Sequence, residues 1–171
     1  MTPLPRPLGG GEFVIWRIDM EQYAASWDSG IGAFQFGGRW NSKGNHAVYA
    51  SLDPSTTILE RAVHTGFNAL DNNRHILTSV IIHEPAKIHV VEPDAVPNPH
   101  WLIPGATSAA QQAYGDALTA DHPFVIVPSA ISSRSWNIIF NPETAQGNYA
   151  LRSQERFALD PRLNPPSNDT I

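Results

Sequence analysis

The chain has 171 residues, a formal charge of −5, a pI near 5.7 and no cysteine. An acidic chain without a run of lysine or arginine lacks the basic face that sequence-independent binding to DNA or RNA requires. The absence of cysteine excludes disulfides, thiolate metal sites and cysteine nucleophiles. The start of the chain lacks the apolar core of a signal peptide, and no apolar run approaches the ~18 residues that span a membrane. The sequence therefore predicts a one-domain, cytoplasmic protein.

The first part of the chain predicts two short strands separated by a long loop. Residues 1–12 are rich in proline and glycine and are expected to form a flexible arm. The apolar run Phe13–Ile18 predicts a buried strand, and Arg17 is the one charge inside it. Residues 19–38 are punctuated by glycine and predict an irregular loop, after which residues 47–51 predict a second strand.

A helix with clear start and stop signals follows. Asp53 before Pro54 is typical of an N-cap followed by proline at the first helical position. Gly66 is a natural stop, so the helix is predicted over residues 54–65. Glu60 falls just beside the apolar arc of this helix, which predicts a half-buried carboxylate.

The second part of the chain mixes strands and helices without a regular βαβ alternation, which favours an α+β fold with a mixed, mostly antiparallel sheet. A helix is predicted from a Thr107 or Ser108 cap to about Ala120. Residues 92–106 predict a proline-rich loop and residues 164–171 a polar tail, so the domain itself is expected over residues 13–163. The remaining strands are predicted over residues 76–82, 87–91, 124–127, 136–140 and about 149–158.

Three polar side chains on three consecutive elements predict the lining of one pocket. Arg39 lies on a glycine-flanked turn, Tyr49 on a strand and Glu60 near the middle of the next helix. An arginine binds a phosphate or carboxylate through its fork of donors. A tyrosine supplies a ring face with a hydroxyl at its edge. A glutamate accepts hydrogen bonds from sugar hydroxyls or stabilises a developing cation.

Seven short motifs, taken in their order along the chain, resemble the RES domain, a family named for its arginine, glutamate and serine. The resemblance runs from about residue 13 to residue 163. Several such motifs in the same order are specific. The motifs are Trp16-Arg17, Gly37-Gly38-Arg39-Trp40-Asn41, Val48-Tyr49-Ala50-Ser51, Leu59-Glu60, Val127-Pro128-Ser129-Ala130, Asn137 with Asn141-Pro142, and Phe157 with Asp160-Pro161-Arg162-Leu163.

The resemblance implies a bacterial toxin of a toxin–antitoxin pair, with a fold related to ADP-ribosyltransferases. Such a toxin consumes NAD⁺, which makes NAD⁺ a substrate rather than a cofactor. The expected reaction is phosphorolysis to nicotinamide and ADP-ribose-1″-phosphate, with inorganic phosphate as co-substrate. The expected partner is a helix-turn-helix antitoxin of the Xre type that covers the active-site entrance. A homodimer of the chain within such a complex is compatible with this expectation.

The resemblance also assigns roles to five residues. The two arginines of the family fall on Arg17 and Arg39, its tyrosine on Tyr49, its glutamate on Glu60 and its serine on Ser129. Glu60 is expected to hold the ribose hydroxyls and to stabilise an oxocarbenium-like transition state. The arginines are expected to bind phosphates, Tyr49 to pack on the nicotinamide or ribose, and Ser129 to donate to a phosphate or to the carboxamide.

One position departs from the pattern. Some members carry a second tyrosine directly after the first arginine, where this chain has Ile18. The function of that tyrosine is therefore absent here or is supplied by another group, for which Tyr23 and Trp27 are the candidates.

Each of the two arginines has a plainer alternative. Arg17 suits an edge strand with a surface ion pair, an interaction that stabilises proteins little. Arg39 suits stacking on Trp40 or Trp27.

The other three residues have plainer alternatives too. Tyr49 suits a core aromatic, and Glu60 suits a solvated helix charge paired with His64 at i, i+4. Ser129, after a proline, suits a turn.

The histidines do not predict a metal site. His83 and His89 flank Glu84, but this spacing matches no helical zinc motif. No Rossmann, P-loop or G-x-S-x-G motif occurs, although composition alone does not exclude a serine hydrolase acting through Ser129. Two further functions stay open beside NAD⁺ phosphorolysis: ADP-ribosylation of a protein, and a catalytically inactive partner-binding domain.

Overall fold

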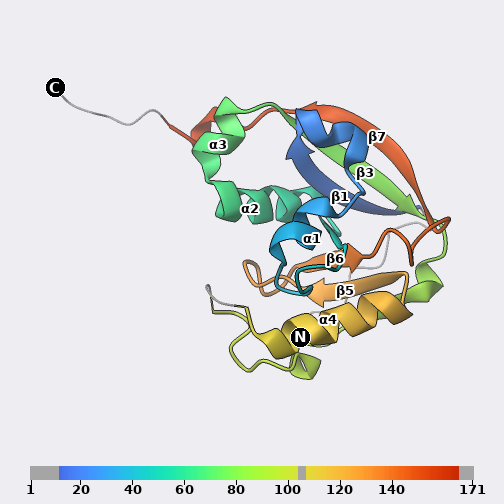
Figure 1. The fold of residues 1–171 in the computed structure, drawn as a ribbon. Coiled ribbons are helices and arrows are strands. Elements are labelled where there is room, and N and C mark those ends of the chain that lie inside the picture. Colours follow the sequence, from blue (N-terminus) through green and yellow to red (C-terminus); the bar gives the residue numbers. More distant parts are fainter. Residues whose placement is uncertain (1–11, 104–106, 166–171) are drawn as a thin grey trace.

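The computed structural model describes residues 12–103 and 107–165, and a seven-stranded sheet runs through them (Figure 1). The order of strands across the sheet is β4-β5-β6-β2-β1-β3-β7. Every neighbouring pair is antiparallel except β4 and β5, which are parallel. The strands are β1 (Phe13–Met20), β2 (Val48–Ser51), β3 (His75–Ile82), β4 (Ile88–Val90), β5 (Phe124–Pro128), β6 (Trp136–Phe140) and β7 (Tyr149–Phe157).

The sheet brings early and late parts of the chain together at its centre. Strand β6 lies between β5 and β2, with Asn137 opposite Ser51. Strand β1 lies between β2 and β3, so the side chains of β1 are not on a sheet edge. Because side chains alternate between the two faces of a strand, Arg17 and Asp19 share one face of β1.

The helices pack beside the sheet (Figure 1). Helix α2 contacts β1 and β2, and helix α4 contacts β5. Asp53 caps α2 by accepting a 2.8 Å hydrogen bond from the Thr56 N–H, and Ser108 caps α4. The α-helices are α1 (Ile31–Phe36), α2 (Pro54–Thr65), α3 (Phe67–Asn72) and α4 (Ala109–Asp121), and 3₁₀ helices cover Glu21–Ser26, Pro85–Lys87, Pro93–Ala95 and Pro161–Leu163.

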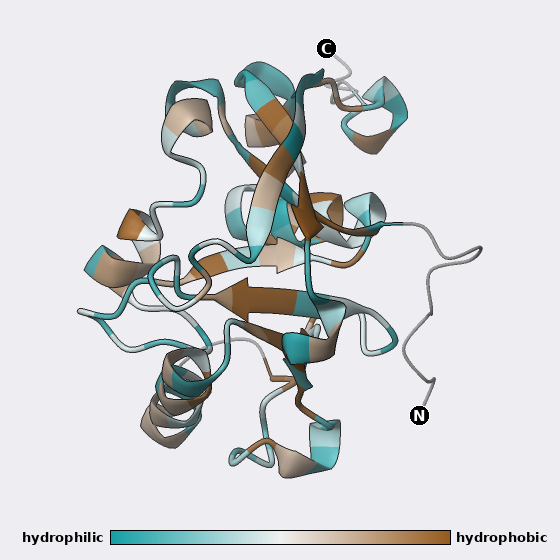
Figure 2. Cartoon of the chain, turned by 90° about the vertical axis from the view of Figure 1, so that its right-hand side faces the viewer, coloured by the Kyte–Doolittle hydropathy of each residue, from teal (hydrophilic) through white to brown (hydrophobic). Residues whose placement is uncertain are grey.

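The core follows the apolar strands. Strand β5 is buried along its whole length, and Ile138, Ile139 and Phe140 of β6 are fully buried beside it. Figure 2 shows the strongest hydrophobic colours on strands in the middle of the molecule. The edge strand β7 is mostly exposed and carries polar side chains that blunt edge-to-edge association.

The α+β fold with a mixed, mostly antiparallel sheet is confirmed, and the predicted helix over residues 54–65 has the predicted ends. The irregular loop predicted over residues 19–38 is wrong, because most of it forms a 3₁₀ helix and α1. Two of the glycines that suggested a loop lie at helix ends: Gly30 and Gly37 have positive φ and flank α1. The predicted arm over residues 1–12 and tail over residues 164–171 fall almost entirely outside the described residues. None of the helices in the described ranges is long and apolar enough to cross a membrane.

Candidate active site

Three adjoining cavities form one cleft between helix α1, helix α2 and strands β1 and β2. The main cavity has a volume of about 790 Å³ and is lined by Arg39 and Glu60, among others. The side cavity, of about 530 Å³, is lined by Arg17. The connecting cavity, of about 160 Å³, contains both Arg17 and Glu60 in its wall. Tyr49 and Arg61 line all three cavities, so they stand where the cavities meet.

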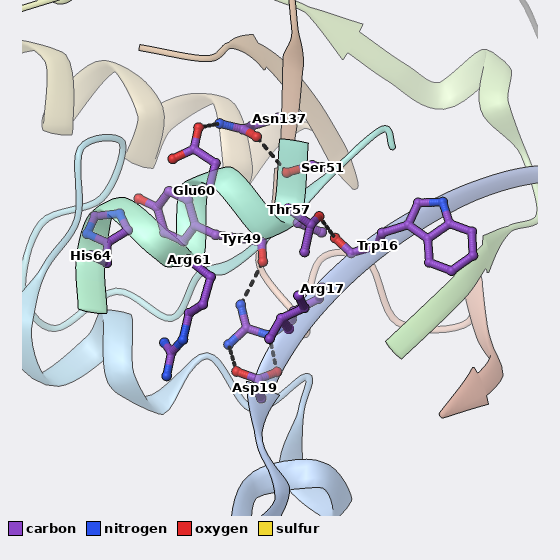
Figure 3. Close-up of a pocket in the computed structure, with 12 residues that line it drawn as sticks. Trp16, Arg17, Asp19, Tyr49, Ser51, Thr57, Glu60, Arg61, His64 and Asn137 are labelled. Atoms are coloured by element: carbon purple, nitrogen blue, oxygen red, sulfur yellow. Dashed lines mark hydrogen bonds and ion pairs between the residues drawn. The ribbon is translucent and has the colours of Figure 1, made fainter. Parts of the chain in front are cut away.

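Glu60 projects from α2 and is fixed by two donors from the β5–β6 region, of which Figure 3 shows Asn137. Its Oε1 accepts a 2.8 Å hydrogen bond from the Ser129 hydroxyl and a 2.5 Å hydrogen bond from the Asn137 amide. The Ser51 hydroxyl donates in turn to the side-chain oxygen Oδ1 of Asn137 at 2.8 Å, which sets the orientation of that side-chain amide. Glu60 Oε2 receives neither of the two bonds. The half-buried carboxylate is therefore oriented by neutral donors on one side while it lines the main and connecting cavities.

Ser129 lies behind Glu60 and is fully buried. Besides donating to Glu60, its hydroxyl accepts hydrogen bonds from the N–H groups of Ile131 and Ser132 at 3.2 and 3.1 Å. Its own N–H donates to the Ser135 carbonyl at 3.0 Å. Both donors of Ser129 are thus used inside the protein, and neither is directed at the cleft.

The turn Gly37–Asn41 is held by Asn41 and Tyr49. The Asn41 amide, 1% exposed, donates to the carbonyls of Ala33, Ser42 and Asn45 at 3.0 to 3.1 Å. The Tyr49 hydroxyl donates to Asn41 Oδ1 at 2.7 Å and accepts from the Trp40 N–H at 3.1 Å.

Glycine is required beside this hydroxyl. A β-carbon at Gly38 would lie 2.5 Å from the Tyr49 hydroxyl oxygen, which is closer than a β-carbon comes to an atom it is not bonded to. Burial raises the pKa of the Tyr49 phenol above its ordinary value of 10, and the hydrogen bond from Trp40 opposes that rise. The phenol consequently stays a neutral donor at physiological pH.

Arg39 extends from this turn into the wall of the main cavity. Its Nη1 donates to the Trp101 carbonyl at 2.6 Å, a bond between segments far apart in the sequence. Helix α4 supports the turn from the other side, where Gly115 packs directly on the Trp40 carbonyl and Gln112 donates to the Gly38 carbonyl at 2.8 Å.

Arg17 is braced within the protein. Its Nε and Nη2 donate to the two oxygens of Asp19 at 2.6 and 2.7 Å, and its Nη1 donates to the Tyr49 carbonyl at 2.6 Å (Figure 3). The alternative of an ion pair is thus present, but the edge-strand position expected for it is wrong, because β1 is an interior strand. Since Arg17 has five N–H groups, two remain for a ligand.

The structure brings four of the five predicted residues into the wall of one cleft: Arg17, Arg39, Tyr49 and Glu60. Ser129 lies behind the cleft wall, where its hydroxyl contacts the lining residues Glu60 and Ile131. The ion pair of Glu60 with His64, the plainer alternative, is replaced by the bonds to Ser129 and Asn137.

Sequence reasoning missed the roles of Asn137, Asp19 and Arg61. Asn137 is the one polar residue in an otherwise apolar strand, which was a usable signal. Asp19 follows Arg17 at the two-residue period of a strand, a weaker signal. Arg61 had none, because consecutive helix residues point in directions about 100° apart.

The position of the missing second tyrosine is filled by core packing. Ile18 is 5% exposed and packs in a cluster with Leu77 and Leu159. Of the two proposed substitutes, Tyr23 is half-exposed on the wall of the side cavity, and Trp27 is buried against Tyr149.

No metal cluster is found in the described ranges: no three histidine, aspartate or glutamate side chains there lie close enough to hold an ion. The cleft is instead cationic. Among the described residues of its wall, three arginines (Arg17, Arg39 and Arg61) face two carboxylates (Asp19 and Glu60), in a chain whose formal charge is −5. Such a site is suited to an anionic ligand.

Comparisons with known proteins identify the family of the chain. A relative from Photorhabdus laumondii subsp. laumondii, named Toxin Res, is 30% identical over 153 residues, which cover 88% of this chain and 96% of that protein. A relative from Sphingobium sp., named Prs ADP-ribosylating toxin, is 31% identical over 153 residues, which cover 86% of this chain and 94% of that protein. In the crystal structure of the M. tuberculosis MbcT–MbcA toxin–antitoxin complex, a chain matches with a TM-score of 0.61 and 18% identity over 86% of this chain and 85% of that one, which supports the fold. The family model named RES domain matches residues 14–160, and the chain therefore belongs to the RES domain family.

Proposed function

We propose that this chain is the toxin of a toxin–antitoxin pair and that it degrades NAD⁺ by cleaving the nicotinamide–ribose bond. The preferred acceptor of the ADP-ribose is inorganic phosphate. Two similar proteins are named toxins, and the structural neighbour comes from a toxin–antitoxin complex. These comparisons support the class of function, and the cleft supports the chemistry.

The observation that carries the proposal is the oriented carboxylate of Glu60 in a cationic cleft. NAD⁺ carries a diphosphate, which suits arginine side chains, and ribose hydroxyls, which suit a carboxylate acceptor. Because nicotinamide leaves as a neutral molecule, the reaction needs no general acid. One carboxylate is then sufficient, in contrast to the pair that most glycosidases use.

The proposed reaction moves one glycosyl group. The bond between the anomeric carbon and the nicotinamide nitrogen breaks, and the nicotinamide keeps the electron pair. The anomeric carbon gains oxocarbenium character, which the Glu60 carboxylate stabilises electrostatically while it holds the ribose hydroxyls. A phosphate oxygen then forms a bond to the same carbon, which gives nicotinamide and ADP-ribose-1″-phosphate.

The residues behind the cleft support this chemistry by position. Ser129 and Asn137 orient Glu60, so in this proposal Ser129 acts as a positioning residue rather than as a ligand of the substrate. Arg39 binds a phosphate from the turn that Tyr49 stabilises, and the Tyr49 ring packs on the nicotinamide or ribose. Arg17 contributes its two remaining N–H groups.

Product analysis tests the proposal directly. Purified protein is incubated with NAD⁺, with and without inorganic phosphate, and the products are identified by mass, with Glu60→Gln as the control. Nicotinamide and a phosphorylated ADP-ribose that form only with phosphate are the expected products. Hydrolysis would appear as ADP-ribose without phosphate dependence. Normal turnover by Glu60→Gln would remove this carboxylate from the mechanism.

A second candidate keeps the fold and the bond that breaks but changes the acceptor to a protein. It is favoured by the 31% identity to the protein named Prs ADP-ribosylating toxin. NAD⁺ labelled in the adenosine half distinguishes the two, because the label ends in a small molecule in one case and on a protein band in the other. A catalytically inactive domain would give neither product and would not arrest growth on expression.

We propose further that an Xre-type antitoxin covers the entrance of the cleft. Phe36, Val63 and Leu102 line the main cavity and are 75%, 60% and 47% exposed, an apolar rim typical of a surface that meets a partner. If the partner works by occlusion, deleting its covering segment restores NAD⁺ consumption. Continued inhibition by the shortened partner would reject occlusion.

A further inference from the structure

Arg61 stands out in the cleft because a buried donor of its guanidinium has no partner. Its Nε is buried and has no hydrogen-bond partner among the described residues, and Asp19, whose charge favours the charged guanidinium, is already bonded through both oxygens to Arg17. A buried donor without a partner is costly, which is why such groups are rare and call for an explanation. An anionic ligand that accepts from the guanidinium provides one.

The location of Arg61 suits a ligand that reaches from one cavity into another. It lines the main, side and connecting cavities, and among the described residues only Tyr49 does the same. Arg61 directly follows Glu60 in α2, so its side chain leaves the helix about 100° away from that carboxylate. Figure 3 shows Arg61 extending beside the Arg17–Asp19 pair rather than toward Asn137.

The other two arginines of the cleft are more constrained. Arg17 uses three N–H groups in hydrogen bonds to Asp19 and Tyr49, and Asp19 balances its charge. Arg39 donates one hydrogen bond to the Trp101 carbonyl. Burial lowers the pKa of Arg61, the charge of Asp19 opposes this, and the charge of Arg17 adds a smaller lowering. The guanidinium still carries its charge at neutral pH, since arginine is not deprotonated in proteins.

We propose that Arg61 binds a phosphoryl group of the substrate at the junction of the three cavities. This inference rests on the proposed function and assigns a residue outside the five carried by the family resemblance. The phosphoryl group has two sources: the diphosphate of NAD⁺, or the inorganic phosphate that accepts the ADP-ribose. Both offer the oxygens that an arginine fork binds with two parallel hydrogen bonds.

Direct binding distinguishes the two sources. ADP-ribose and inorganic phosphate are titrated calorimetrically into the wild-type protein, Arg61→Gln, Arg61→Lys and Arg152→Gln. Arg152 on β7 makes the matched control, since its loss changes the net charge equally and its side chain is half-exposed away from the cleft. The melting temperature of each variant is measured alongside, and Arg61→Lys keeps the charge in case Arg61→Gln fails to fold.

We expect Arg61→Gln to weaken the binding of one probe by about tenfold or more, which is the loss of affinity typical of one charge-assisted hydrogen bond. Arg152→Gln leaves both affinities unchanged, and Arg61→Lys recovers part of the loss. A selective effect on ADP-ribose assigns the diphosphate, and a selective effect on phosphate assigns the co-substrate.

Two results overturn the inference: wild-type affinity of folded Arg61→Gln for both probes, or no binding of either probe by the wild-type protein. Failure of the proposed function has a different signature. Arg61-dependent binding by a protein that leaves NAD⁺ intact would reject NAD⁺ cleavage and keep the anion site.

Discussion

Replacing Ser129 with alanine tests how strongly the fold and the cleft depend on one buried hydroxyl. The hydroxyl donates to Glu60 and accepts the N–H groups of Ile131 and Ser132. The substitution removes a single oxygen and leaves the packing otherwise intact. The Glu60 carboxylate nevertheless loses one of its two hydrogen-bond donors. The backbone N–H groups of Ile131 and Ser132 lose the acceptor that they share.

The expected cost follows from these three bonds. A hydrogen bond to a charged group contributes about 1.5 kcal/mol or more, and each backbone N–H that loses its acceptor costs at least about 1 kcal/mol unless water replaces it. With partial replacement by water in the half-buried turn, the free energy of unfolding falls by about 2–3 kcal/mol. For a chain of this length, that lowers the melting temperature by about 4–12 °C.

The matched control is Ser133→Ala, an exposed serine in the same turn. Thermal melts and NAD⁺ turnover are measured for both variants. We expect Ser129→Ala to lose both stability and, by roughly tenfold or more, turnover, because Glu60 keeps only Asn137 as a donor. A Ser129→Ala protein that melts and turns over like Ser133→Ala would refute this account of how the carboxylate is held.

Two further predictions concern the turn Gly37–Asn41. Tyr49→Phe removes a buried hydroxyl that makes two hydrogen bonds, so unfolding becomes easier by about 1–2 kcal/mol at neutral pH. Because burial raises the pKa of the folded phenol above its ordinary value of 10, the unfolded chain loses this proton first, and stability falls as the pH rises above about 10. Urea titrations from pH 8 to 11.5 should show a smaller alkaline loss for Tyr49→Phe than for the wild-type protein, and an equal loss would contradict the burial of this hydroxyl. Gly115→Ala adds a methyl group against the Trp40 carbonyl, so we expect a loss of about 1–3 kcal/mol although alanine is the better helix former by about 1 kcal/mol. A higher melting temperature for Gly115→Ala would mean that helix propensity outweighs the contact.

Local signals predicted much of the fold. Asp53, Pro54 and Gly66 defined both ends of α2, and apolar runs located β5 and β6. These features depend on neighbours in the sequence, which a single chain displays. Glycine was ambiguous over residues 19–38, because it marks helix ends as readily as loops.

Long-range partners were beyond the sequence. Arg17, Arg39, Tyr49 and Glu60 line one cleft in the structure, but nothing in the sequence connects Glu60 to Asn137 or Arg39 to the Trp101 carbonyl. Those bonds depend on strand order and on side-chain direction, which follow from the whole fold. For the same reason Ser129 was expected to face a ligand and instead faces Glu60.

The late position of β6 in the chain and its central position in the sheet have a consequence for synthesis. Glu60 receives its donors from residues 69 and 77 positions further along the chain. Because the chain emerges from the ribosome in order, Glu60 and its helix are made well before either donor exists. A nascent chain that ends before residue 137 therefore contains the carboxylate without the groups that orient it. In the proposed function, the ribosome-bound protein therefore lacks its oriented carboxylate until most of its 171 residues have been made.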